Sequence, residues 1–228
     1  MSQQEKKKKE HVAKVIVVGD LGTGKTSIIQ RYVNGLFSRK YKTTIGVDFA
    51  SKILEYDEKT TVNIQLWDIG GQEMYRNMTR VYYKSTVGGI VVYDLTKEPT
   101  FDAVLKWKED IDSKVRTNKG EPIPVVLVAN KIDLIDEEQE KELGEENWRK
   151  NKKEMDEFCK KHNFISWFNT SAKENLNVDE CTYSLIDHII TNDIHEDKQV
   201  DKEILKMEDE EGSESDDEEQ RPKKSNCC

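Results

Sequence analysis

The chain has 228 residues, 36% of them charged, and a formal net charge of −9. Residues 193–228 hold 14 acids and 6 bases, so the excess of acid lies in a C-terminal tail, and the middle of the chain has the composition of one globular domain. No apolar run approaches the roughly 18 residues that span a membrane. No apolar stretch follows the N-terminal lysines, so we expect no secretory signal there. The middle of the chain is not basic enough for nucleic acid to be the main partner.

Strand-like apolar runs alternate with helical patterns between residues 11 and 192. In chain order we expect a strand at Val12–Val18, a helix at Lys25–Asn34, strands at Val47–Glu55 and Thr61–Trp67, a helix at Glu73–Lys84, a strand at Gly88–Asp94, a helix at Phe101–Val115, a strand at Val125–Asn130, a polar helix ending near His162, a strand at Phe164–Asn169 and a helix at Val178–Thr191. This alternation predicts an α/β fold, a mostly parallel six-stranded sheet with helices on both faces, in which one hairpin adds an antiparallel strand. Ligand sites in such folds lie at the carboxyl ends of the strands.

The chain has three parts by composition. We expect a flexible basic N-terminus at residues 1–10, one domain at residues 11–192 and a disordered acidic tail at residues 193–228, since the tail has too little apolar surface to order itself. The four cysteines are Cys159, Cys181, Cys227 and Cys228. They lack the spacing of zinc ligands, and their pattern is typical of a reduced cytosolic protein rather than of a disulfide-bonded one.

The first motif predicts a phosphate-binding loop. Between the first strand and the first helix stands the run Gly19-Asp20-Leu21-Gly22-Thr23-Gly24-Lys25-Thr26, which fits the pattern G-x-x-x-x-G-K-[ST]. Its glycines let backbone N–H groups close around phosphate oxygens, and the helix N-terminus adds positive potential. Lys25 is expected to reach the β- and γ-phosphates and Thr26 to ligate Mg²⁺. We assign the adjoining Ser27 to the same site.

A second motif follows the third strand, with the sequence Asp68-Ile69-Gly70-Gly71-Gln72. An acid at a strand end can hold magnesium, here through a water, and Gly71 lets its backbone amide approach a γ-phosphate. Gln72 can orient the attacking water. Taken alone, this pattern is also that of an acidic turn after a strand, so its weight comes from the phosphate loop upstream.

A third set of residues predicts the recognition of guanine. The run Asn130-Lys131-Ile132-Asp133 follows the fifth strand, and Ser171-Ala172-Lys173 follows the sixth. The Asp133 carboxylate can accept hydrogen bonds from guanine N1–H and the exocyclic amine, a donor pair that adenine lacks. Lys131 is expected to pack along the base, and a backbone amide of residues 171–173 to contact guanine O6. These residues argue against the alternative of an ATP-using P-loop enzyme.

These motifs, in this order and each at a strand end, resemble the Ras superfamily of small GTPases, and its Rab branch in particular. The resemblance covers about residues 11–192 and includes the segments Ile45-Gly46-Val47-Asp48-Phe49, Trp67–Glu73, Tyr82-Tyr83-Lys84 and Tyr93-Asp94-Leu95-Thr96. Two further stretches, Asn77–Tyr83 and Met155–Lys173, are similar to the Rab subgroup that serves lysosome-related organelles and pathogen-containing vacuoles. The Rab-like aromatics and the Cys-Cys end stand against a soluble Ras-like or Rho-like role.

The resemblance implies a Ras-like P-loop GTPase fold and a GTP/GDP-dependent switch that recruits effectors to membranes and regulates vesicle trafficking. It makes Thr44 the switch residue that ligates Mg²⁺ and senses the γ-phosphate, and Phe37 the aromatic that packs on the guanine. Effectors would read a surface made of Tyr41, Ile45, Gly46, Val47, Asp48, Phe49, Trp67 and Tyr82. The implied partners are an exchange factor, a GTPase-activating protein, effectors, a GDP dissociation inhibitor and a prenylation escort, and we expect a monomer that binds no nucleic acid.

Two residues depart from the common pattern of the superfamily. Leu21 stands where Gly or Ser is frequent, although the related subgroup also tends to carry Leu. Gly70 replaces the alanine of the family pattern W-D-x-A-G-Q; the second glycine either loosens the loop that holds Gln72 and slows hydrolysis, or is tolerated without effect. No arginine stands out as a cis finger, so we expect turnover on the order of 10⁻⁴–10⁻³ s⁻¹ without a partner. The alternative function is a hydrolysis-poor, GTP-binding platform for effectors.

The tail and one surface segment carry the remaining predictions. Terminal paired cysteines on a Rab-like chain resemble a double geranylgeranylation site. Cys227 and Cys228 are therefore expected to anchor the chain to the cytoplasmic face of endosomal, phagosomal or lysosome-related membranes, with a cytosolic pool. Ser213 and Ser215 lie among acids, as acidophilic kinase sites do. The long charged segment around Trp148 predicts either a solvated, ion-paired surface helix or a partner site specific to the subgroup.

Overall fold

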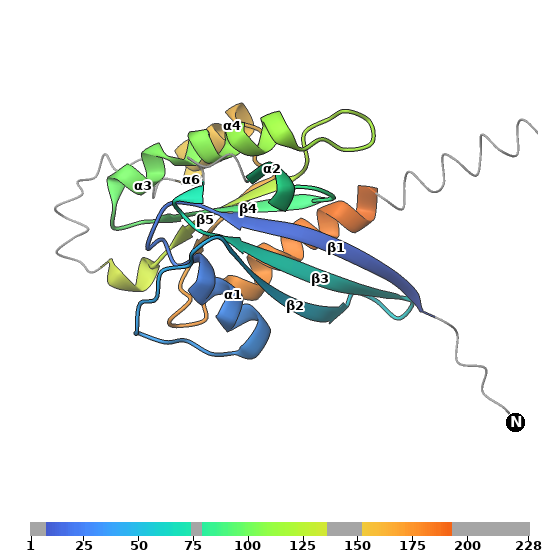
Figure 1. Cartoon of the computed structure of the whole chain (residues 1–228), viewed down its shortest axis with the longest axis horizontal. Coiled ribbons are helices and arrows are strands. Elements are labelled where there is room, and N and C mark those ends of the chain that lie inside the picture. The colour runs from blue at the N-terminus through green and yellow to red at the C-terminus, as the bar shows by residue number, and fades with distance from the viewer. Residues whose placement is uncertain (1–7, 74–78, 136–151, 193–228) are drawn as a thin grey trace, which may run out of the picture. The chain divides into compact units, whose positions relative to one another are not determined.

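The computed structural model describes residues 8–73, 79–135 and 152–192 (Figure 1). The chain divides into two units, Met1–Ile189 and Ile190–Cys228. Residues 1–7 of the expected flexible N-terminus, Trp148, and the acidic tail with its serines and terminal cysteines fall outside the described residues. The boundary predicted at residue 10 is wrong, because Lys9 and Glu10 already belong to the first strand, Lys9–Val18.

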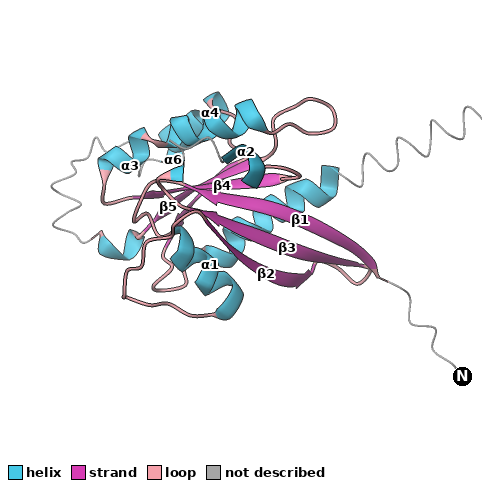
Figure 2. Cartoon of the chain, viewed as in Figure 1, coloured by secondary structure: helices cyan, strands magenta, loops and turns pink. Residues whose placement is uncertain are grey.

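Six strands form one sheet, drawn in magenta in Figure 2. They are β1 (Lys9–Val18), β2 (Val47–Glu55), β3 (Thr60–Ile69), β4 (Gly88–Asp94), β5 (Val125–Asn130) and β6 (Ser166–Thr170). Their order across the sheet is β2-β3-β1-β4-β5-β6, and of the strand pairs described only β2 with β3 is antiparallel. The predicted six-stranded, mostly parallel sheet with one antiparallel addition is therefore confirmed.

Burial explains the two sequence patterns among the strands. Every residue of β4 and β5 is buried, because parallel strands are joined by crossovers that place helices over both faces of a sheet. These strands therefore read as continuous apolar runs. β2 lies at the edge of the sheet and consists of exposed and half-buried residues, as expected of an antiparallel edge strand that faces solvent.

Helices cover both faces of the sheet. In Figure 1, α1 (Lys25–Asn34) and a helix at 178–192 lie on one side, and α3 (Glu98–Asp102), α4 (Val104–Lys114) and α6 (Lys152–Lys161) lie on the other. Two short elements are α2 (Thr79–Tyr82) and the 3₁₀ turn η2 (Ile132–Leu134). None of the helices in the described part of the chain is long and apolar enough to cross a membrane.

Some helices differ from their predicted extents. The single helix expected at Phe101–Val115 is two helices, α3 and α4, which are separated at Ala103. α3 starts earlier than predicted because Pro99 occupies its first turn, where the missing N–H of proline would have had no helical partner. Of the helix expected at Glu73–Lys84, the described part is α2, and of the polar helix before the last strand it is α6.

The strand ends bring the predicted motifs to one edge of the sheet. In the parallel register, Val17 of β1 lies beside Asp68 of β3. Asn130 of β5 likewise lies between Asp94 of β4 and Thr170 of β6. The loops that follow β1, β3, β5 and β6 therefore meet at the carboxyl edge, which is where open α/β sheets bind their ligands.

Candidate functional site

The loop between β1 and α1 has backbone conformations that only glycine adopts readily. Gly19 has a φ of 140° and Gly24, directly before α1, a φ of 97°, in the region that L side chains rarely enter. Space is also lacking, because a Cβ on Gly19 would stand 2.0 Å from the carbonyl oxygen of Val92, and one on Gly24 would stand 2.3 Å from Asn130 Nδ2. The loop thus folds over the N-terminus of α1, the usual place of an anion-binding loop.

Lys25 places an ammonium group inside this loop. Its side chain is buried, and Nζ donates hydrogen bonds to the carbonyl oxygens of Gly19 at 2.8 Å and Asp20 at 3.0 Å. Burial lowers the pKa of Lys25 to about 8, and the carboxylates of Asp68 and Asp20 oppose that shift. A bound phosphate would supply the negative charge that favours the ammonium form.

Asp20 anchors the loop to α4. One of its carboxylate oxygens accepts a hydrogen bond of 3.1 Å from the indole N–H of Trp107, a fully buried residue. The backbone carbonyl of Asp20 also accepts bonds from Thr23 Oγ1 and Lys25 Nζ. Asp20 is not among the described residues that line the cavity, so it orders the loop from behind. No local pattern in the sequence points to Trp107 as its partner.

Three oxygen-bearing side chains meet at the ends of β3 and α1. Asp68 is buried, and its Oδ2 accepts hydrogen bonds from the hydroxyls of Thr26 and Thr44, the latter at 3.1 Å. The two hydroxyl oxygens are 3.0 Å apart. Asp68 Oδ1 is buried without a hydrogen-bond partner among the described residues, and burial raises the pKa of this carboxyl group. Two hydroxyls and a carboxylate are the hard oxygen ligands that Mg²⁺ takes, so these residues fit that ion.

Asn130, the last residue of β5, joins the loops that follow β1 and β6. Its Nδ2 donates to the carbonyl oxygen of Thr23 at 2.8 Å, and its Oδ1 accepts from Thr170 Oγ1 at 3.2 Å and from the backbone N–H of Ala172 at 3.3 Å. The loops after β1 and β6 are therefore held against β5. One of the backbone amides that the sequence offers for guanine O6, that of Ala172, is directed at Asn130 in this structure.

Asp133 is held in a fixed orientation at the other end of the site. Its Oδ1 accepts a hydrogen bond of 2.6 Å from Ser171 Oγ, and Lys173 Nζ lies 3.6 Å from its Oδ2. Lys131 Nζ is bonded to Asp94 Oδ2 at 2.7 Å. A carboxylate placed in this way keeps lone pairs for a ligand that presents two donors side by side.

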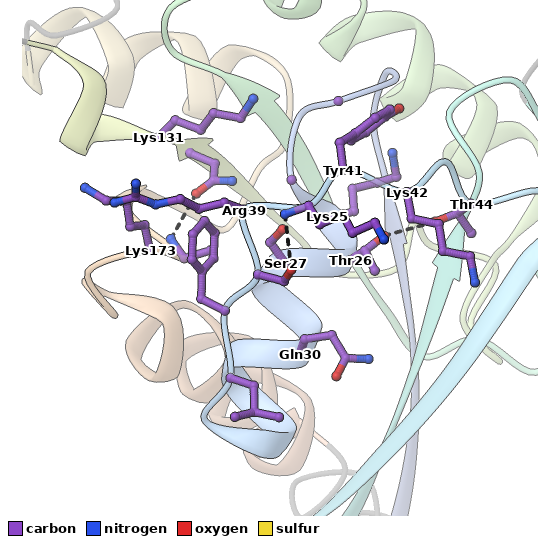
Figure 3. Close-up of a pocket in the computed structure, with 18 of the residues that line it drawn as sticks. Lys25, Thr26, Ser27, Gln30, Arg39, Tyr41, Lys42, Thr44, Lys131 and Lys173 are labelled. Carbon is purple, nitrogen blue, oxygen red and sulfur yellow. Dashed lines mark hydrogen bonds between the residues drawn. The ribbon is translucent and has the colours of Figure 1, made fainter.

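A cavity of about 900 Å³ connects these groups, and its size suits a nucleotide. Figure 3 shows Thr26 and Thr44 at one end of it and Lys131 and Lys173 at the other. The predicted nucleotide-binding residues that line it are Leu21, Gly22, Gly24, Lys25, Thr26, Ser27, Phe37, Thr44, Gly71, Asn130, Lys131, Asp133, Ala172 and Lys173. Those that stand behind the lining are Gly19, Asp20, Thr23, Asp68 and Ser171.

The segment after β3 places Gly71 at the cavity and Gln72 outside it. Gly71 is buried and lines the cavity, whereas Gln72 is exposed and is not among the described lining residues. Gly70 is buried and is bonded at both backbone groups, since its N–H donates to the carbonyl oxygen of Gly46 and its own carbonyl accepts from the N–H of Glu73, each at 2.9 Å. Gly70 is thus closely packed and bonded in this structure, and the effect of the second glycine on hydrolysis stays a prediction.

The residues predicted for effector binding lie on two surfaces. Phe49 of β2 and Trp67 of β3 are cross-strand partners and form an edge-to-face pair with ring centroids 5.8 Å apart. Lys14 Nζ lies 3.8 Å from the centroid of the Trp67 ring. Tyr82 is half-buried and, like Trp67, packs against the hydrophobic core. Tyr41, by contrast, lines the nucleotide cavity (Figure 3).

Two arginines belong to the site although the sequence did not single them out. Arg31 of α1 donates from Nε to the carbonyl oxygen of Ala172 at 2.8 Å and from Nη2 to that of Lys173 at 2.9 Å, so it holds the loop after β6 against α1. Arg39 lines the cavity from the loop between α1 and β2. No local sequence pattern predicts the contacts of either arginine.

Comparisons with known proteins agree with this geometry. A model of the Ras family matches residues 14–191. The chain is 54% identical over 184 residues to the Ras-related protein Rab-32 of Sus scrofa, an alignment that covers 81% of this chain and 77% of that protein. It is 51% identical over 196 residues to Rab-32A of Dictyostelium discoideum, covering 86% and 85% of the two chains. With Rab-7L1 of Homo sapiens it shares 41% identity over 184 residues, covering 81% and 85%. The chain therefore belongs to the Ras family, as a small GTPase of the Rab type that binds and hydrolyses GTP.

Proposed function

We propose that this GTPase is a molecular switch whose GTP form recruits effectors to membranes and so regulates intracellular vesicle trafficking. The observation that carries the proposal is the contact beside the cavity between the loop that carries Thr44 and the end of β3, where the Thr44 hydroxyl donates to Asp68. A γ-phosphate next to this contact would hold both segments, and its loss would release them. The output is then a change in exposed surface rather than a chemical product.

In this proposal the triphosphate lies in the loop at 19–26, with Lys25 Nζ at the β- and γ-phosphates. The hydroxyls of Thr26 and Thr44 hold Mg²⁺, with Asp68 acting through a water, and the ion supplies positive charge beside the phosphates. Phe37 packs on the guanine, Lys131 lies along it, and Asp133 accepts from its two donors. The spacing of these groups along one cavity supports this placement.

Hydrolysis in this site would depend on position and charge. Gln72 orients a water whose oxygen attacks the γ-phosphorus in line. The bond from that phosphorus to the β–γ bridging oxygen breaks, and GDP and phosphate leave. The backbone N–H of Gly71 and the ammonium of Lys25 stabilise the charge on the transferred group.

The nucleotide dependence of effector binding tests the switch. We expect Phe49→Ala to weaken the binding of an effector to the form loaded with a non-hydrolysable GTP analogue by about 30-fold, because exposed aromatics are frequent hot spots of interfaces. Ile53→Ala is the matched control, since Ile53 lies on the same strand and is 69% exposed against 53% for Phe49. Titration calorimetry with the analogue and with GDP gives both affinities. Equal effector affinity for the two nucleotide forms would contradict the proposal.

We assign membrane attachment to geranylgeranyl groups on Cys227 and Cys228, because two isoprenoid chains suit stable anchoring where a single lipid does not. The acidic tail repels anionic lipids, so the lipid groups and not charge would hold the membrane. Exchange factor, activating protein, dissociation inhibitor and prenylation escort are the partners that such a cycle requires.

Counting reactive thiols tests the lipid attachment. Cys159 and Cys181 are buried, and burial raises the pKa of each to about 12. Since the thiolate is the nucleophile, an unmodified native chain is expected to react with a maleimide at two of its four cysteines, with no increase between pH 7 and pH 9. In the chain purified from eukaryotic cells, neither Cys227 nor Cys228 is expected to react, and the mass is expected to include two isoprenoid groups. Two reactive thiols in that cellular protein would contradict the assignment.

We further propose that the membrane-bound pool lies on endosomal, phagosomal or lysosome-related compartments, beside a cytosolic pool. Support comes from the subgroup resemblance at Asn77–Tyr83 and Met155–Lys173 and from the similarity to Rab-32 proteins. Fractionation with compartment markers checks this placement, and phosphate mapping of the same material shows whether Ser213 or Ser215 is modified.

One observation favours the second candidate function, a hydrolysis-poor platform for effectors. Leu21 lines the cavity and is 40% exposed, and in this second candidate its side chain crowds the γ-phosphate or an incoming activating group. Single-turnover hydrolysis by the full chain decides between the two. A slow rate that an activating protein raises supports the switch, whereas no detectable hydrolysis with or without that protein supports the platform.

A further inference from the structure

Two adjacent glycines, Gly70 and Gly71, follow the end of β3, and their backbone conformations do not require glycine. Gly70 and Gly71 are both buried, and neither has a positive φ. An alanine could adopt their backbone conformations. What differs is the space around each α-carbon, and the two glycines face different neighbours.

Gly71 faces the phosphate loop, and Gly70 faces the loop that carries Thr44. A Cβ on Gly71 would stand 2.5 Å from the backbone nitrogen of Leu21. A Cβ on Gly70 would stand 2.8 Å from the carbonyl oxygen of Thr44 and 3.1 Å from that of Gly46. The distances of 2.5 Å and 2.8 Å are shorter than real Cβ contacts, and that of 3.1 Å is tight. All three obstacles are backbone atoms, which cannot rotate away as a side chain can.

The close approach at Gly70 is also a bonded one. The Gly70 N–H donates to the carbonyl oxygen of Gly46 at 2.9 Å. The Gly46 N–H in turn donates to Oε1 of the buried Glu73 at 3.2 Å. The backbone of Gly46 is therefore fastened through both its polar groups to the segment that begins at Gly70.

The same loop is fastened a second time two residues earlier. The Thr44 hydroxyl is bonded to Asp68 Oδ2 at 3.1 Å and lies 3.0 Å from the hydroxyl of Thr26. Thr44 and Gly46 thus belong to one short stretch of backbone that is bonded to the end of β3 and the residues after it at both positions.

We propose that Gly70 is a positioning residue, which sets how closely residues 44–46 dock on the end of β3 and thereby places the Thr44 hydroxyl for the triphosphate form. The methyl group of the alanine in the family pattern would hold residues 44–46 further out. The inference rests on the proposed role of Thr44 at Mg²⁺, and it assigns to this chain a more closely docked loop than that pattern allows.

The consequence is specific to one nucleotide state. Thr44 is needed only where a γ-phosphate and its ion are present. A displaced loop therefore lowers the affinity for the triphosphate and does not change the affinity for GDP. A shift of a few tenths of an ångström in a ligating group is expected to cost about tenfold. A defect of folding would act on both nucleotide states equally.

The test measures the release of a fluorescent, non-hydrolysable GTP analogue from the full chain at increasing Mg²⁺ concentrations. Gly70→Ala is expected to raise the Mg²⁺ concentration that halves this release about tenfold. The rate of GDP release and the melting temperature of the GDP form are expected to stay unchanged. Gly89→Ala is the matched control, because a Cβ there meets only side-chain atoms at 3.4 Å or more. Thr44→Ala in the same assay reports on the proposed function itself.

The outcomes separate the inference from its premise. If Thr44→Ala raises the Mg²⁺ requirement and Gly70→Ala does not, the inference is overturned and the proposed function stands; if Thr44→Ala has no effect, both fall. Should Gly70→Ala fail to fold, Glu73→Ala removes the other bond to Gly46 and is expected to act in the same direction, while Glu73→Gln, which keeps an oxygen acceptor, is expected to stay near the wild type. A Glu73→Ala protein that matches the wild type would then overturn the inference.

Discussion

Asp133→Asn is expected to lower the affinity for guanine nucleotides by about four orders of magnitude. The carboxylate of Asp133 can accept from both guanine donors, whereas an asparagine turns one acceptor into a donor and sets it against the exocyclic amine. The hydrogen bond from Ser171 and the nearby ammonium of Lys173 hold the carboxylate in place, so it cannot turn away from the mismatch. Competition with fluorescent GDP measures the loss.

The same variant is expected to gain affinity for xanthine nucleotides, because xanthine presents a carbonyl oxygen where guanine has its amine. Asp112→Asn serves as the control, since Asp112 is an ion-paired aspartate on α4 that does not line the cavity, and it should leave both affinities unchanged. Equal losses for guanine and xanthine nucleotides would show that Asp133 acts only by ordering the loop around Ser171. The specificity of the site would then have to come from other groups.

The parts of this site that the sequence predicts are those whose signal is local. The phosphate loop needs its glycines within a few residues of Lys25, and the strand before it and helix after it are visible in the apolar pattern. β1, α1, β2 and β5 accordingly lie at or within a few residues of their expected bounds. Fold class follows from the same alternation, because strands that alternate with helices are typical of a mostly parallel sheet covered by helices.

The contacts that hold the loops together could not be predicted in the same way. Trp107 bonds to a residue 87 positions away, and Arg31 to one 141 positions away, and neither residue type is unusual in its own helix. Gly70 shows a different limit. The sequence marks it as a departure from the family pattern, yet only the structure shows that the carbonyl oxygens of Thr44 and Gly46 leave little space for a Cβ there.

Gly71→Ala is expected to slow GTP hydrolysis by about 100- to 1,000-fold while GDP binding changes little. An alanine Cβ would stand 2.5 Å from the backbone nitrogen of Leu21 and 2.7 Å from the carbonyl carbon of Asp20, so the end of β3 would have to move away from the phosphate loop. The Gly71 N–H would then no longer reach the γ-phosphate, and the loss of one such donor typically costs two to three orders of magnitude in rate. Single-turnover hydrolysis and GDP release measure the two effects.

The neighbouring glycine provides the sharpest comparison for this variant. Gly70→Ala pushes on residues 44–46 and is expected to act through the Mg²⁺ requirement, whereas Gly71→Ala pushes on the phosphate loop and is expected to slow hydrolysis even when Mg²⁺ is saturating. Gly89→Ala, in the middle of the sheet, should do neither. If saturating Mg²⁺ restored hydrolysis in Gly71→Ala, the two glycines would act through one common movement of the loop, and separate roles for them would be wrong.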